Sequence, residues 1–74
     1  MNIRRSKDFA VRVKEVRGQL GLSQNELADR LGVSFATINR WENGRTRPSK
    51  LAYSQFQTYC EKMINKGLLD RERV

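Results

Sequence analysis

The side chains best suited to recognition chemistry share one face of a short segment near the middle of the sequence. If residues 34–43 form a helix, in which each residue advances by about 100°, Ile38 and Trp41 face one way and a mixed polar and apolar set faces the other. In such a set, arginine can bond guanine O6 and N7, asparagine can bond adenine, and apolar groups can contact the thymine methyl. The pattern predicts a surface that reads base edges in the major groove, formed by Phe35, Ala36, Asn39 and Arg40.

Three of these side chains have an alternative role inside the protein. Phe35 could pack as a hydrophobic staple, Arg40 could be a solvated surface cation, and Asn39 could make only local hydrogen bonds. We expect DNA contact for Phe35 and Arg40 and leave both roles open for Asn39. Trp41 could stack on a ligand, but its position on the wheel favours the core.

Polar and basic side chains beside this face are suited to the DNA backbone. Arg45, Arg47 and Lys50 lie in or next to a loop-like segment, where they are either solvated or, as we expect, flank the phosphates. Thr37 lies between the two faces and Asn43 at the end of the outer one, and we expect both to bond phosphate. Such contacts fix register on the duplex rather than sequence.

The overall charge points to the same class of partner. Lys and Arg outnumber Asp and Glu by 15 to 8, which gives a net charge of +7. A polyanion, most simply nucleic acid, is the natural partner of such a chain. Arg4, Arg5 and Lys7 could also reach phosphates, although a disordered arm is an equal alternative.

The remaining composition argues against other classes of function. The sequence has no His and one Cys, Cys60, so it predicts no internal disulfide, no Cys/His metal cluster and no acid–base or nucleophilic constellation. We therefore expect no enzyme activity and no cofactor. No apolar run is long enough to cross a membrane, and no signal-peptide pattern is present, which predicts a cytoplasmic protein without a membrane partner.

Two helices are expected before the segment 34–43. Apolar residues at steps of four and three, from Phe9 to Leu20, predict an amphipathic helix over 7–19 that stops at Gly21. Ser23 and Glu26 have the spacing of a capping box, which begins a second helix that ends at Gly32.

Two further helices follow. Ser34 can cap a third helix that runs to about residue 43, and the segment from Ser49 to Lys66 predicts a fourth that is unusually long. One face of the last helix carries Ala52, Phe56, Tyr59 and Met63. The chain is therefore expected to be all-α, a small bundle of four helices, divided into a basic arm (1–8), a helix-turn-helix domain (9–66) and a flexible tail (67–74).

Several spaced motifs agree in order and register with one family. The sequence resembles the Cro and phage-repressor helix-turn-helix family, also called the XRE family, over roughly residues 9–51. The motifs are Leu22-Ser23-Gln24, Glu26-Leu27-Ala28, Leu31-Gly32-Val33-Ser34 and Trp41-Glu42-Asn43-Gly44.

The resemblance implies a sequence-specific DNA-binding regulator, often a dimer. It also implies that Gln24 contacts a phosphate. It further implies an ion pair between Arg17 on the first helix and Glu42 on the third, at least partly buried. The single long last helix departs from the two short helices usual in the family. That departure leaves the usual dimer interface in doubt.

Double-stranded DNA is thus the expected partner, and transcriptional repression by occupation of an operator is the expected function. The alternative is a DNA-targeting module or antitoxin-type autoregulator, whose other activity lies in a toxin partner or a fused effector domain. RNA binding is less favoured, because the aromatic residues fall at core spacing rather than on a stacking surface. We also expect a symmetric homodimer built on the last helix or on Leu68 and Leu69; a monomer, whose long helix covers only its own core, is the alternative.

Overall fold

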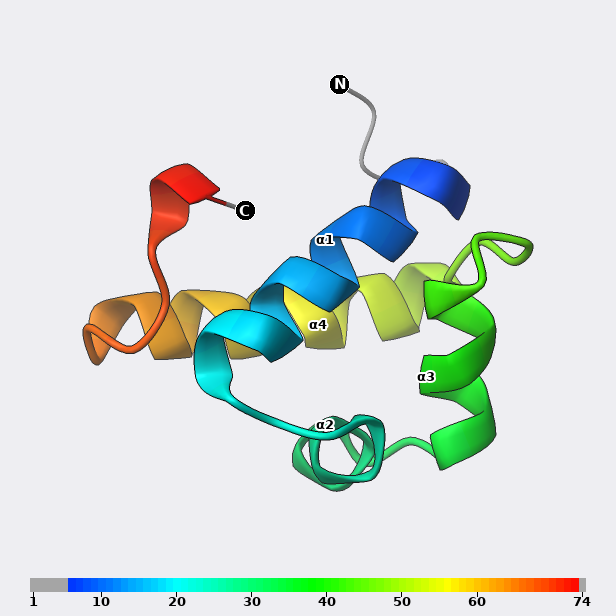
Figure 1. The fold of residues 1–74 in the computed structure, drawn as a ribbon, viewed down its shortest axis with the longest axis horizontal. Coiled ribbons are helices and arrows are strands. Elements are labelled where there is room, and N and C mark those ends of the chain that lie inside the picture. Colours follow the sequence, from blue (N-terminus) through cyan, green and yellow to red (C-terminus); the bar gives the residue numbers. More distant parts are fainter. Residues whose placement is uncertain (1–5, 74) are drawn as a thin grey trace.

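The computed structural model describes residues 6–73, and nearly all of them lie in helices or short turns (Figure 1). The predicted all-α bundle of four helices is confirmed, the last helix is the longest at 16 residues, and no strand occurs within this range. The elements are α1 (Ser6–Leu20), α2 (Gln24–Leu31), α3 (Phe35–Glu42), α4 (Lys50–Asn65) and a short 3-10 helix, η1 (Arg71–Arg73).

Side-chain caps begin three of these helices. Ser23 and Glu26 form the predicted capping box, in which the Ser23 N–H donates to Glu26 Oε1 (2.8 Å) and the Glu26 N–H donates to Ser23 Oγ (3.0 Å). Ser34 caps α3 through the Thr37 N–H at 3.1 Å, and Ser49 caps α4 through the Ala52 N–H at 3.1 Å. Each cap satisfies a backbone donor that would otherwise lack a partner at the helix start.

The turn between α2 and α3 depends on one glycine. Gly32 adopts φ +71°, a left-handed conformation that strains residues with a Cβ atom. The chain reverses there, and the Val33 N–H donates to the Ala28 carbonyl at 3.0 Å. This geometry places α3 against both α1 and α2.

An aromatic cluster centred on Phe9 holds α1, α3 and α4 together. The Phe9 ring lies 5.1 Å from Trp41 and 5.2 Å from Phe56, centroid to centroid, in edge-to-face geometry, and 6.0 Å from Tyr53. Edge-to-face pairs of this kind contribute beyond their buried area. Trp41 therefore belongs to the core, as its position on the helical wheel predicts.

Cys60 lies in the same core, on the buried face of α4. Its side chain is 1% exposed, and burial raises the pKa of the thiol above its ordinary value. Met63 and Phe56 are buried on either side of it along the helix, as the stripe of apolar residues predicts.

The ends of the described chain add to the packed unit. α1 begins at Ser6, so residues 6–8 of the expected arm are helical, while residues 1–5 lie outside the described residues and Arg4 and Arg5 with them. Beyond α4, Leu69 is 4% exposed and packs in the core, and the Asp70 N–H donates to Gln19 Oε1 at 2.8 Å. The expected flexibility of residues 67–74 stays a prediction.

Two ion pairs attach the same C-terminal segment to the helices. Arg71 pairs with Glu61 on α4 at 2.8 Å, and Arg73 pairs with Glu15 on α1 at 3.3 Å. Among residues 6–73, no helix has the length and apolar character needed to cross a membrane.

Candidate nucleic-acid interface

The outer face of α3 is mostly exposed, whereas its opposite face is buried. Ile38 and Trp41 are at most 3% exposed and fix the helix to the core, whereas Phe35 is 47% exposed. Ala36 and Arg40 are also exposed, and Asn39 is half-buried. The four residues predicted to read bases therefore share one face of the helix.

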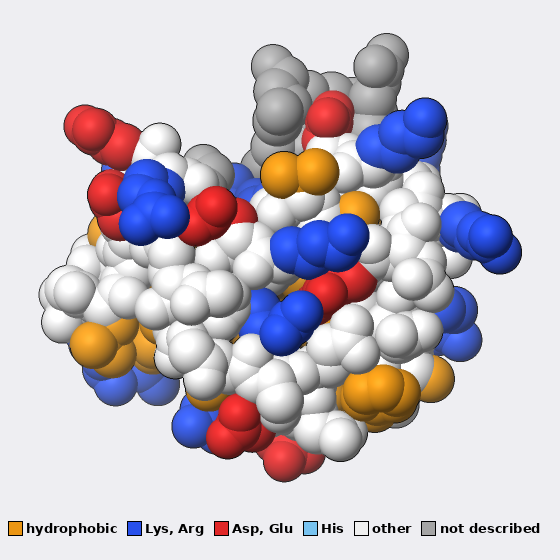
Figure 2. Space-filling model, viewed as in Figure 1, with side chains coloured by type: hydrophobic (Ala, Val, Ile, Leu, Met, Phe, Trp, Pro, Cys, Tyr) orange, Lys and Arg blue, Asp and Glu red, His pale blue; other side chains and the backbone are white. Residues whose placement is uncertain are grey.

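Positive charge lines the edge of the molecule at α3. In Figure 2, Lys and Arg side chains lie along the right edge, over α3 and the loop that follows it. Arg45, Arg47 and Lys50 are exposed there, and none of them makes an ion pair with another residue in the range 6–73. Unpaired cations beside an exposed reading face fit phosphate groups on either side of a groove.

The start of α1 lies beside this loop. A Cβ atom on Gly44, which has φ +74°, would lie 3.8 Å from the Lys7 Cα atom. Lys7 therefore lies next to the basic loop, although more than thirty residues separate them in sequence. Periodicity places Lys7 only at the start of a helix, so its closeness to the loop is visible only in the fold.

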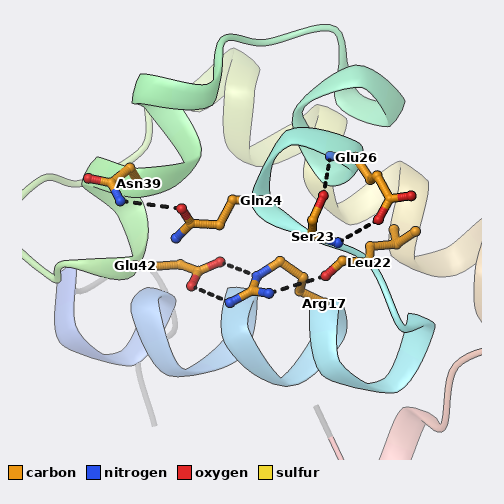
Figure 3. Close-up of polar contacts among 7 residues, drawn as sticks. All are labelled: Arg17, Leu22, Ser23, Gln24, Glu26, Asn39 and Glu42. Atoms are coloured by element: carbon orange, nitrogen blue, oxygen red, sulfur yellow. Dashed lines mark hydrogen bonds and ion pairs between the residues drawn. The ribbon is translucent and has the colours of Figure 1, made fainter.

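An ion pair between Arg17 and Glu42 joins α3 to α1 (Figure 3). Arg17 Nε lies 2.7 Å from Glu42 Oε2, and Arg17 Nη2 donates to Glu42 Oε1 at 3.0 Å. A third bond runs from Arg17 Nη1 to the Leu22 carbonyl at 3.1 Å. The hydrogen bonds to Glu42 raise the pKa of Arg17 above its ordinary value.

The amide side chains of Gln24, Asn39 and Asn43 form a chain of hydrogen bonds across the helix-turn-helix. Asn39 Nδ2 donates to Gln24 Oε1 at 3.3 Å, and Asn43 Nδ2 donates to Asn39 Oδ1 at 3.3 Å. Asn39 thus makes the local hydrogen bonds that the sequence left open. Figure 3 shows the Gln24 amide nitrogen turned away from Asn39, and within the described part of the chain it donates to no acceptor.

Hydroxyl groups occupy the first turn of α3. Ser34 Oγ and Thr37 Oγ1 lie 2.9 Å apart, and Arg40 Nη2 reaches Thr37 Oγ1 only at 3.5 Å. That distance is the limit of a useful hydrogen bond, so the Arg40 guanidinium retains most of its donors for another partner.

Within 6–73, no three His, Cys, Asp or Glu side chains gather in a way that could hold a metal ion. This face of the protein is basic and carries several hydrogen-bonding side chains.

Comparison with known proteins gives matches of two kinds. A family model described as helix-turn-helix (HTH_3) matches residues 13–52. An uncharacterised HTH-type transcriptional regulator of Archaeoglobus fulgidus is 38% identical over 64 residues, which cover 85% of this chain and 90% of that protein. A second such regulator of the same organism is 33% identical over 64 residues and is covered over 91% of its length.

Partial matches extend to larger proteins. A type II methyltransferase of Lactococcus lactis subsp. cremoris is 42% identical over 57 residues, which are 73% of this chain but 15% of that protein. The match covers only the helix-turn-helix part of the methyltransferase, whereas the near full-length relatives are HTH regulators. No solved structure matches the chain.

Proposed function

Since this chain belongs to the helix-turn-helix (HTH_3) family and contains its DNA-binding domain, we propose that it is a sequence-specific transcriptional regulator that acts as a repressor. The observation that carries the proposal is the outer face of α3, which is exposed while the rest of the helix is anchored. Occupation of an operator would exclude polymerase or another regulator, and this mechanism needs no cofactor. The proposal implies a cytoplasmic location.

In this proposal α3 enters the major groove with its N-terminal half nearest the bases. Arg40 reads guanine, Phe35 and Ala36 contact thymine methyl groups, and Asn39 reads adenine. The phosphate contacts come from Gln24, Thr37, Asn43, Arg45, Arg47 and Lys50. Within residues 6–73 the Gln24 amide nitrogen donates to no acceptor and Arg45, Arg47 and Lys50 make no ion pair, which supports this division.

Selection of bound sites from random duplex DNA tests the proposal. We expect a defined consensus for the parent protein. Arg40→Ala should weaken binding to that consensus by about 1–3 kcal/mol and relax one base position. Lys14→Ala is the matched control, because Lys14 is an exposed cation on α1 outside this face, and it should leave the consensus unchanged. An identical consensus for Arg40→Ala would exclude Arg40 as a base reader.

The salt dependence of binding tests the phosphate contacts separately. The affinity of the parent protein should fall steeply as salt rises. Arg45→Ala and Arg47→Ala should weaken binding to all sequences about equally and flatten that slope. A parent protein with no salt dependence would contradict the assignment.

A second candidate is a DNA-targeting module or antitoxin-type autoregulator that works with a partner or an attached effector domain, and the methyltransferase match favours the form with an attached domain. The candidates differ in what the chain does alone. Repression of a reporter promoter that carries the selected site supports the regulator. Occupation of the site without an effect on transcription supports the targeting module.

A further inference from the structure

We propose that the groove between α2 and α4 docks an acidic segment of a partner protein. The groove has a volume of about 310 Å³ and lies outside the surface assigned to DNA. α2 and α4 contact each other along it. Its lining includes Arg30 and Leu31 of α2 and Ser54, Thr58, Tyr59 and Lys62 of α4.

The charge of the groove is positive, and Glu26 on α2 offsets Arg30 only in part, through an attraction without a close ion pair. Arg30 and Lys62 face it from different helices, and neither makes an ion pair with any residue between 6 and 73. The residues that line the groove, all within that range, include no Asp or Glu. The carboxylate of Glu26, one turn before Arg30, is held by the Ser23 N–H at 2.8 Å.

Hydrogen-bond donors accompany the two cations. Ser54 and Thr58 present hydroxyl groups from successive turns of α4. Tyr59 lies half-buried beside them, and its phenol is a further O–H donor at neutral pH. Cations with neutral O–H donors around them are suited to carboxylate groups.

The shape of the groove favours a protein segment over a small free anion. Most of the lining is exposed, and only Leu31 at its base is buried. Small-molecule sites enclose most of their ligand, whereas this open groove would leave a small anion largely in water. Carboxylates on a partner protein need less enclosure, because the rest of that interface holds them in place.

The groove is separate from the reading face. None of its lining residues belongs to α3 or to the basic loop 43–49. An acidic segment in the groove would therefore leave α3 free, and a DNA-bound copy could recruit such a partner.

Chemical-shift titration of the full chain with a capped glutamate hexamer tests the proposal. Backbone amide shifts should saturate and be confined to the C-terminal half of α2 and to residues 54–62 of α4. Arg30→Gln and Lys62→Gln should each weaken binding by about twofold to fivefold, as expected for exposed charge pairs. Lys14→Gln, the matched control on α1, should bind the peptide as tightly as the parent.

Three outcomes would overturn the proposal. Shifts spread over α3 and the basic loop would show general attraction to a basic surface. Equal shifts from a glutamine hexamer, or from inorganic phosphate at the same charge concentration, would remove the assignment to an acidic peptide. Displacement of the peptide by duplex DNA would place the groove within the DNA surface.

Discussion

Arg17 is the residue through which three parts of the fold meet. Its guanidinium contacts Glu42 at the end of α3 with two nitrogens and the Leu22 carbonyl before α2 with a third. The Glu42 side chain is 5% exposed, and that of Arg17 is 28% exposed. The negative charge of the buried Glu42 carboxylate is therefore compensated by Arg17.

Loss of Arg17 should accordingly destabilise the protein more than loss of a surface charge. Arg17→Ala is expected to lower the free energy of unfolding by about 3 kcal/mol, because it leaves a buried carboxylate unmatched. An exposed pair would contribute about 1 kcal/mol or less. Denaturant unfolding of Arg17→Ala, Glu42→Gln and the double variant measures the coupling. A coupling energy near zero would show that the pair contributes no more than a surface contact.

The sequence pattern predicts only part of the Arg17–Glu42 ion pair. Periodicity places Arg17 beside the apolar face of α1 and Glu42 beside that of α3, but only the family resemblance indicates that the two side chains meet. The Asn39 contacts were left open for the same reason, since a helical wheel shows nothing of Gln24 on another helix. Contacts between elements depend on tertiary geometry, which one-dimensional spacing does not contain.

Glu26 offers a pH-dependent measurement at the same scale. The hydrogen bond from the Ser23 N–H lowers the pKa of Glu26 below its ordinary value. A lowered pKa in the folded state means that the stabilisation is present above the unfolded-state pKa and is lost as pH falls through the folded one. Carboxyl NMR titration should show this lowered pKa. Glu61 is a useful internal reference, because its low pKa comes from Arg71 instead.

Ser23→Ala separates the two parts of the capping box. It removes the hydroxyl but keeps the backbone N–H that bonds Glu26, so the pKa of Glu26 should rise only part of the way towards its ordinary value. A Glu26 carboxyl that titrates at its ordinary value in the parent protein would contradict the box.

At the scale of elements, helix boundaries were the most predictable feature. Each boundary depends on local chemistry: Ser23, Ser34 and Ser49 as caps, and Gly32 and Gly67 at positive φ where chains leave helices. The C-terminal segment was less predictable, because its contacts with Gln19 and the core are distant in sequence. A pair of leucines after a glycine has no period from which burial can be inferred.

The two leucines of that segment provide a matched test of its packing. Leu69 is 4% exposed and Leu68 is 57% exposed. Leu69→Ala should lower the free energy of unfolding by about 2–3 kcal/mol, since it leaves a cavity in the core. Leu68→Ala should change it by less than about 0.5 kcal/mol. Equal effects in thermal or denaturant unfolding would mean that the segment is not packed as described.

At the scale of the whole molecule, the apolar surface bears on assembly. Cys60 is buried, and Tyr53 and Ile64 pack against the core, so the chain itself covers much of the apolar surface of the last helix, on which the sequence predicts a homodimer. Leu51 and Leu68 remain exposed, but Leu51 lies in the first turn of α4 and Leu68 lies beyond its last residue, and α4 itself is about 24 Å long. Separate small patches favour pairing on DNA over a stable dimer in free solution.

The homodimer that the sequence predicts should therefore form only on the DNA site. We expect a monomer by sedimentation at micromolar concentration, and two copies on a duplex that carries inverted half-sites about 34 Å apart. A duplex with a single half-site is the control and should bind one copy. One copy on both duplexes would exclude pairing.

Chemical labelling of the buried Cys60 thiol can measure how often the core of the protein opens. Alkylating reagents attack thiolates, and this thiol is both enclosed and shifted towards its protonated form. Because the sequence has no other cysteine, the rate of labelling by mass spectrometry reports one site alone. The native protein should be labelled more slowly than the denatured chain, by a factor equal to the ratio of closed to open molecules. Bound DNA should slow the labelling further. Labelling of the native protein at nearly the denatured rate would place Cys60 in a region that opens independently of the core.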